Sequence, residues 1–237
     1  MLKPYQSLPI QDCGEPLVAI PLTEFSTETP PPYARLGADY GDQSPYCLRA
    51  GVLAALQDAQ ANLRRIEPGW SLHIFDAYRP LAVQQFMVDY TYGELLKGRS
   101  LSPDALSNAQ QADLWQEVYQ FWAAPNPDPA TPPPHSTGAA LDLTLINALG
   151  ELVPMGGEID EISVRSHPDY YAHPQNDREQ TYGDHRQLLR DAMAAAGFRQ
   201  HPNEWWHFSQ GDQLWAWLNQ QSDPTGEYLA RYGRVIF

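Results

Sequence analysis

The sequence predicts an α+β fold, with a central antiparallel sheet flanked by helices and a proline-rich arm at the N-terminal end. Segments with helical and with strand periodicity both occur, without the regular strand–helix alternation of a doubly wound sheet. The length of 237 residues suits one large domain or two small ones, and no internal repeat divides it. We therefore predict a single domain over 1–237, made of an arm (1–45), a catalytic core (46–210) and a C-terminal extension (211–237).

The first half of the chain contains two helical and two strand patterns. The arm is expected to be extended, with a strand over 17–22 and loops around it. Apolar residues recur every three to four positions over 48–66 and predict a helix, which Pro68-Gly69 would end. Alternation over 71–78 predicts a strand. Pro80 then suits the first turn of a second helix.

The second half begins with a predicted helix over 105–124 and a stiff proline-rich loop. The run AALDLTLI over 139–146 predicts a strand, and a hairpin turn with a short strand is expected after it. A helix is predicted over 183–196, with Gly197 as a good residue to end it. EWWHFSQ, at 204–210, predicts a last strand.

Composition and charge exclude some partners. The formal net charge is −14, from 15 Lys and Arg against 29 Asp and Glu, and such a surface repels a phosphate backbone. We predict no nucleic-acid partner. No signal peptide and no membrane-spanning segment is found, so we expect no membrane partner and a cytoplasmic location. Cys13 and Cys47 form no C-x-x-C pair, and both their pairing and the oligomeric state stay open.

His135 and Asp142 stand seven positions apart around a Ser-Thr-Gly turn. A histidine and an aspartate at such a spacing are common by chance. However, Asp142 lies between Leu141 and Leu143 in a strand that we expect to be buried on both sides. An ionised carboxylate there is costly unless a positive charge meets it, and a metal cation is a natural partner.

Glu204 and His207 form a second pair, in the segment NEWWHF. Together, His135, Asp142 and His207 supply two imidazoles and one carboxylate, which is the ligand set of a catalytic zinc site with an open fourth position. Glu204, three residues from His207, need not bind the metal and could take a proton from water. The same ligand set also accepts other divalent ions.

Several motifs resemble a known superfamily of zinc peptidases. HSTGAALD matches the H-x-x-G-x-A-x-D pattern of the superfamily that includes lysostaphin-type and D-alanyl-D-alanine peptidases, and EWWH matches its E-x-x-H. The segments FDAYRP, GELVPMGGEID and RSH are most similar to the D-alanyl-D-alanine dipeptidases of the vancomycin-resistance type. The resemblance covers about 48–209.

This resemblance implies a role for each matching residue. It implies one zinc ion per chain, with His135, Asp142 and His207 as its ligands. Glu204 matches the general base, and Arg79 matches the arginine that stabilises the tetrahedral intermediate. A guanidinium keeps its proton and can donate two aligned hydrogen bonds to an oxyanion.

The resemblance also implies how a dipeptide would be bound. Asp160 matches an aspartate that holds the free amino end, and Tyr33 matches a tyrosine that lines the same pocket. The chain departs from the pattern at Pro133, where the dipeptidases carry a serine that contacts substrate. Because proline cannot donate a hydrogen bond, the exact substrate is open at this point.

The predicted function is therefore zinc-dependent hydrolysis of D-alanyl-D-alanine, or of a close D-dipeptide, with a small dipeptide as the only expected partner. One alternative is a D,D- or L,D-carboxypeptidase that trims the stem peptides of peptidoglycan. Another is a non-catalytic protein that binds cell-wall peptides on the same scaffold. The presence of all three ligand candidates and of Glu204 argues against the second alternative. Recycling of dipeptide and antibiotic resistance would use the same chemistry.

Overall fold

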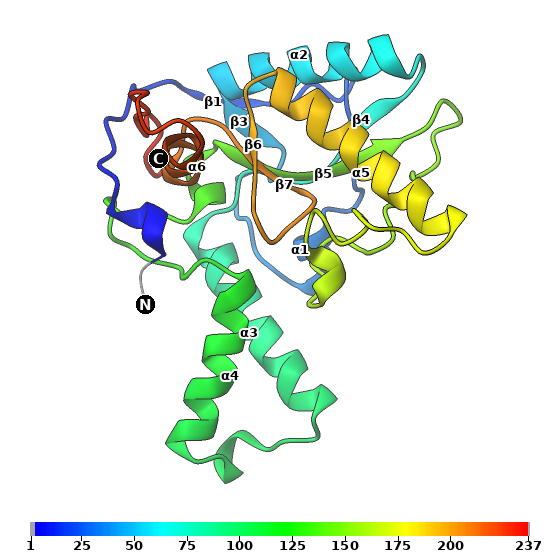
Figure 1. Ribbon diagram of the computed structural model, residues 1–237. Helices are drawn as coiled ribbons and strands as arrows, with labels where there is room; N and C mark the ends of the chain where they lie inside the picture. The colour runs from blue at the N-terminus through cyan, green and yellow to red at the C-terminus, as the bar shows by residue number, and fades with distance from the viewer. Residues whose placement is uncertain (1–2, 237) are drawn as a thin grey trace.

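A five-stranded sheet runs through the computed structural model, which describes residues 3–236 (Figure 1). The strands follow the order β2 (Ser26–Thr27), β4 (Ser71–Asp76), β5 (Ala140–Ile146), β7 (His207–Ser209) and β6 (Arg199–Gln200). This confirms the predicted α+β class. The central strands pair antiparallel, as predicted, and the edge strand β2 runs parallel to β4. Parallel neighbours need a long crossover connection, and the chain between these two strands provides one.

Two helices, α2 (Ala50–Ile66) and α5 (Asp177–Ala195), cover one face of the sheet (Figure 1). The main hydrophobic core lies between them and the sheet, and β5 contributes Leu141, Leu143 and Leu145 to it. Both helices were predicted, with different starts. Leu48 belongs to β3 (Cys47–Arg49), which pairs with β1 (Leu17–Ala19), rather than to α2.

A helical hairpin projects from the other side of the molecule (Figure 1). It consists of α3 (Leu81–Gly98) and α4 (Asn108–Phe121), joined through a short 3₁₀ turn at Pro103–Ala105. Ser107 and Gln110 begin α4 with reciprocal side-chain to backbone hydrogen bonds, which satisfy N–H groups that a helix end leaves free. The hairpin packs around a second cluster of buried residues, to which the N-terminal arm also contributes: Tyr33, Ala38, Val83, Met87, Val88, Val118 and Trp122.

The predicted arm packs against the rest of the chain. It contains a 3₁₀ turn at Pro4–Ser7 and a short helix, α1 (Pro32–Leu36), in a segment predicted to be loop. Proline at the first helical position favours this helix, and Gly37 ends it with φ of 106°. The predicted C-terminal extension contains α6 (Gln213–Ser222), which sequence analysis did not predict.

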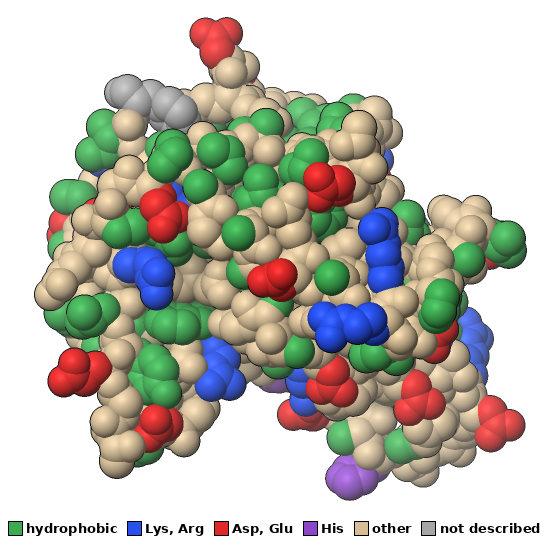
Figure 2. Space-filling view, turned by 90° about the horizontal axis from the view of Figure 1, so that it is seen from above, with side chains coloured by type: hydrophobic (Ala, Val, Ile, Leu, Met, Phe, Trp, Pro, Cys, Tyr) green, Lys and Arg blue, Asp and Glu red, His purple; other side chains and the backbone are tan. Residues whose placement is uncertain are grey.

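The surface over α2 and α5 shows no strong accumulation of one charge. Acidic and basic side chains lie scattered among polar and apolar ones on this face (Figure 2). Within residues 3–236, no helix is both long enough and apolar enough to cross a membrane.

Candidate metal centre and active site

The strand register places two aspartates and one histidine side by side at the middle of the sheet. Asp142 on β5 lies opposite His207 on β7 and opposite Asp76 at the end of β4. Residues that face each other across antiparallel strands project from the same side of the sheet. Asp142 therefore points away from the leucine-rich core, although it is only 2% exposed. This confirms the expectation that its strand is buried on both faces.

His135 reaches the same point from a 3₁₀ turn, Pro134–Thr137, just before β5. Gly138 links the turn to the strand with φ of +70°, and a Cβ atom there would lie 2.5 Å from Leu17 Cδ1, so the position requires glycine. Nδ1 of His135 donates a hydrogen bond to the Ala77 carbonyl at 2.7 Å. That contact leaves the lone pair of Nε2 directed at Asp142 and His207.

The three side chains fit a metal ion. His135 Nε2 lies 3.3 Å from Asp142 Oδ2, His207 Nδ1 lies 3.1 Å from Asp142 Oδ1, and the two nitrogens are 3.1 Å apart. Ligand atoms at about 2.1 Å from a tetrahedral zinc ion are about 3.4 Å from one another. Burial disfavours the charge of Asp142, but the two imidazoles outweigh this and hold its pKa well below the usual range. The site thus offers two nitrogens and an ionised carboxylate to a divalent cation.

Glu204 lies beside these three residues but is not one of the candidate metal ligands. Its side chain is almost buried, with Oε2 3.7 Å from His207 Nδ1 and Oε1 3.8 Å from His201 Nδ1. Burial and the nearby carboxylates of Asp142 and Asp160 raise its pKa well above the usual value. A carboxyl with this position and a raised pKa can both take up and release a proton.

Arg79 is fixed in place by several partners. Its Nε and Nη2 atoms donate to Asp76 Oδ2 at 3.1 and 2.8 Å, and Nη2 also lies 3.3 Å from Asp142 Oδ2. Nη1 donates to Gln84 Oε1 at 3.0 Å. The guanidinium faces the ring of Trp122 with 5.1 Å to its centroid. Arg79 is thus held rigidly beside the candidate metal ligands, and its guanidinium stays charged.

Tyr33 connects Arg79 to Asp160. Its hydroxyl accepts from Arg79 Nη2 at 3.0 Å and donates to Asp160 Oδ2 at 2.9 Å. Burial, and next the charge of Asp142, raise the pKa of Asp160 to about 7. A carboxyl with a raised pKa gains most from a cationic ligand, which would stabilise its ionised form.

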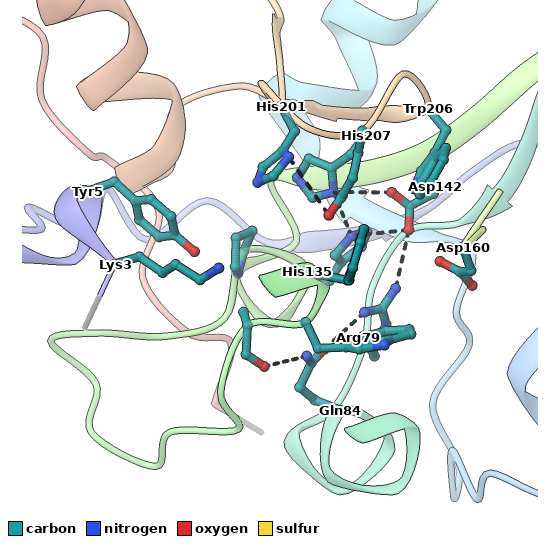
Figure 3. Close-up of a pocket in the computed structure, with 15 residues that line it drawn as sticks. Lys3, Tyr5, Arg79, Gln84, His135, Asp142, Asp160, His201, Trp206 and His207 are labelled. Atoms are coloured by element: carbon teal, nitrogen blue, oxygen red, sulfur yellow. Dashed lines mark hydrogen bonds and ion pairs between the residues drawn. The ribbon is translucent and has the colours of Figure 1, made fainter. Parts of the chain in front are cut away.

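Six of the seven predicted site residues line one pocket (Figure 3): Arg79, His135, Asp142, Asp160, Glu204 and His207. Tyr33, the seventh, contacts two of them from behind. Sequence analysis missed other residues that line or support this pocket: Lys3, Tyr5, Asp76, Gln84 and His201. Asp76 had a readable signal, because a second acidic residue stands in an apolar strand three positions before Arg79.

The chain matches a family of known peptidases. Residues 26–224 match the family model described as D-ala-D-ala dipeptidase. A D-alanyl-D-alanine dipeptidase of Synechocystis sp. is 54% identical over 240 residues, which cover 99% of this chain and 97% of that protein. The D-alanyl-D-alanine dipeptidase of Enterococcus faecium is 31% identical over 168 residues, or 70% of this chain and 69% of that protein. That of Escherichia coli is 33% identical over 144 residues, or 59% and 55%.

Solved structures resemble the chain more weakly. The LdcB LD-carboxypeptidase superposes with a TM-score of 0.47 and 17% identity, over 88% of this chain and 75% of that one.

Proposed function

The chain belongs to the D-Ala-D-Ala dipeptidase family of metallopeptidases, and we propose that it hydrolyses D-alanyl-D-alanine, or a close D-dipeptide, to free D-amino acids. One observation carries this proposal. The half-buried Asp160 lines the same pocket as the three candidate metal ligands. A carboxylate so near the reacting centre suits the free ammonium group of a very short substrate, because charge-assisted hydrogen bonds are strong in buried sites.

The metal in this proposal is one zinc ion, with His135, Asp142 and His207 as ligands. When bound, zinc supplies a Lewis acid that polarises the scissile carbonyl and lowers the pKa of the attacking water. The chain prepares this site in advance, because the Ala77 carbonyl orients His135 and the strand register aligns Asp142 with His207.

Glu204 is the proposed general base. It takes the proton of the attacking water on a carboxylate oxygen and later passes that proton to the nitrogen of the leaving D-amino acid. Its position beside His207, outside the set of candidate ligands, supports this role. Its raised pKa also suits a group that must return the proton within the same reaction.

Arg79 is the proposed donor to the oxyanion that forms from the scissile carbonyl. Asp76 and Gln84 hold the guanidinium, so it needs no reorganisation when the negative charge develops. Tyr33 keeps Arg79 and Asp160 at a fixed separation through its two hydrogen bonds. A fixed separation of the oxyanion and ammonium sites would favour substrates of one length.

The decisive experiment is the release of D-alanine from D-alanyl-D-alanine by the purified protein, with and without a chelator. We expect activity that the chelator abolishes, that added zinc restores, and that Glu204→Ala lacks while it still binds one zinc ion. N-acetyl-D-alanyl-D-alanine is the matched control substrate, because acetylation removes the charge that Asp160 would bind. Equal cleavage of the two substrates would contradict the dipeptidase proposal.

A further inference from the structure

The pocket has a cationic side chain at the end opposite Asp160. Lys3 and Asp160 both line it, and the candidate metal ligands lie between them (Figure 3). Lys3 belongs to the N-terminal segment and precedes the residues 26–224 that match the family. Its ammonium group is thus a feature of this pocket that the family match does not assign.

Few neighbouring groups compensate the positive charge of the Lys3 ammonium group. Within residues 3–236, its Nζ atom donates one hydrogen bond, to the Gln120 carbonyl at 3.4 Å. Among the described residues, no carboxylate oxygen lies within 4.0 Å of its Nζ atom. Burial lowers the pKa of Lys3, and the charge of Glu204 only partly offsets this. A half-buried ammonium with unused donors favours an anionic ligand.

The segment that carries Lys3 is fastened to the body of the protein. Tyr5, two residues on, is buried, and it lines the same pocket. Gln213 of α6 donates to the Leu8 carbonyl at 2.6 Å and also to the Ala130 carbonyl at 2.9 Å. These contacts give Lys3 a defined place from which it can recognise a ligand.

We propose that Lys3 binds the C-terminal carboxylate of the dipeptide substrate. This inference rests on the proposed dipeptidase function. A free dipeptide is a zwitterion, and the pocket offers a carboxylate at one end, a cation at the other and the metal ligands between them. Asp160 and Lys3 together would select substrates that have both ends free. Pro133, next to the pocket-lining Pro134, has neither a hydroxyl nor an N–H to offer the carboxylate.

The test measures binding without turnover, in zinc-loaded protein that carries Glu204→Ala, with any tag placed at the C-terminal end. Calorimetry gives the dissociation constants of D-alanyl-D-alanine and of D-alanyl-D-alaninamide, whose C-terminal end is neutral. We expect Lys3→Met to weaken binding of the acid about tenfold or more and to change binding of the amide less than about twofold. Lys3→Arg should restore part of the lost affinity. Lys97→Met is the matched control, because Lys97 is the only other lysine in the sequence and its side chain, on α3, is exposed.

The outcomes separate this inference from the proposed function. Equal weakening of acid and amide by Lys3→Met would overturn it and indicate that Lys3 only fastens the N-terminal segment. Unchanged binding of both would overturn it as well. In either case, chelator-sensitive release of D-alanine by the unsubstituted protein would leave the dipeptidase proposal intact. Absence of that release, together with no binding of the dipeptide, would refute both.

Discussion

The centre of the sheet and the segments around it hold the pocket in different ways. Asp142 and His207 lie on adjacent strands whose register alone brings them together. Asp160 lies on a loop and Lys3 on the N-terminal segment, and side-chain hydrogen bonds to backbone carbonyls fasten both. The comparison indicates a division of labour, with two of the three candidate metal ligands on adjacent strands and the substrate contacts on segments that can change without disturbing these strands.

Arg186 shows how one of these segments is fastened. This arginine of α5 is 2% exposed, and it donates to the carbonyls of Met155, Arg165 and His167 at 2.7, 2.8 and 3.0 Å. Its guanidinium also faces the rings of Tyr171 and Trp205. Burial lowers the pKa of Arg186 to about 10. One side chain thus ties together both ends of the loop that carries Asp160.

The largest effect is expected at the centre of the sheet. Asp142→Asn keeps the shape of the side chain but removes the charge that faces two imidazoles. Loss of a partner outside the ligand shell typically lowers metal affinity about 10- to 100-fold, and loss of a ligand should cost more. We expect D-alanine release to fall to background and zinc content, measured by atomic absorption, to fall with it. Full zinc content in an inactive variant would mean that Asp142 is not a ligand.

The same substitution at the edge of the pocket should act differently. Asp160→Asn removes the proposed partner of the substrate ammonium but changes none of the three candidate metal ligands. We expect full zinc content, kcat within a few-fold of the unsubstituted protein, and KM for D-alanyl-D-alanine raised about 10- to 100-fold. A reduced kcat with unchanged KM would break the proposed division between centre and edge.

Arg186→Met should have a smaller effect on activity. The substitution removes the Arg186 donor from the Met155 and Arg165 carbonyls, whereas the His167 carbonyl still accepts from the Tyr170 N–H. We expect the free energy of unfolding to fall by about 3 kcal/mol. KM should rise several-fold, because the loop no longer holds Asp160 in one place, while zinc content stays full. Urea unfolding and steady-state kinetics measure the two effects. Arg186→Lys, which keeps a charge but loses the forked donor geometry, should fall between the two proteins.

The smallest effect is expected on the projecting hairpin. Arg99 pairs with Glu117 through exposed side chains, with 2.6 Å between Nη2 and Oε1. Exposed ion pairs contribute less than about 1 kcal/mol, so Arg99→Ala should leave kcat, KM and zinc content unchanged. Its unfolding curve should nearly coincide with that of the unsubstituted protein. This variant is the control for loss of an arginine as such.

Sequence periodicity predicted the main elements but not all of their ends. The helix predicted from 183 begins at Asp177, where the Asn176 side chain accepts from the Glu179 N–H. Asparagine is a common residue at this capping position, but the apolar pattern on which the prediction rests starts later in the helix. The helix α6 was missed although Asp212 caps it in the same way, by accepting from the Trp215 N–H. The short strand expected after β5 reduces to one bridge, at Leu152.

The site was predictable where chemistry and local sequence coincide. An aspartate inside an apolar strand indicated Asp142 without any structure, because a buried charge demands a partner. Arg79, Asp160 and Tyr33 came from the family resemblance, since they lie on three distant segments that only the fold brings together. The place of Lys3 depends on contacts of its segment with residues more than a hundred positions away, such as Gln213. No local pattern encodes such contacts.

The hydrogen bonds of Gln213 also bear on the order in which the pocket is built. Lys3 precedes the candidate metal ligands in the chain, and α6, the helix that fastens its segment, follows them. The candidate metal ligands are complete once His207 has been made, before α6 exists. A growing chain could therefore bind its metal before it can bind both charged ends of a substrate. Recognition of both ends of the dipeptide would then have to wait for α6.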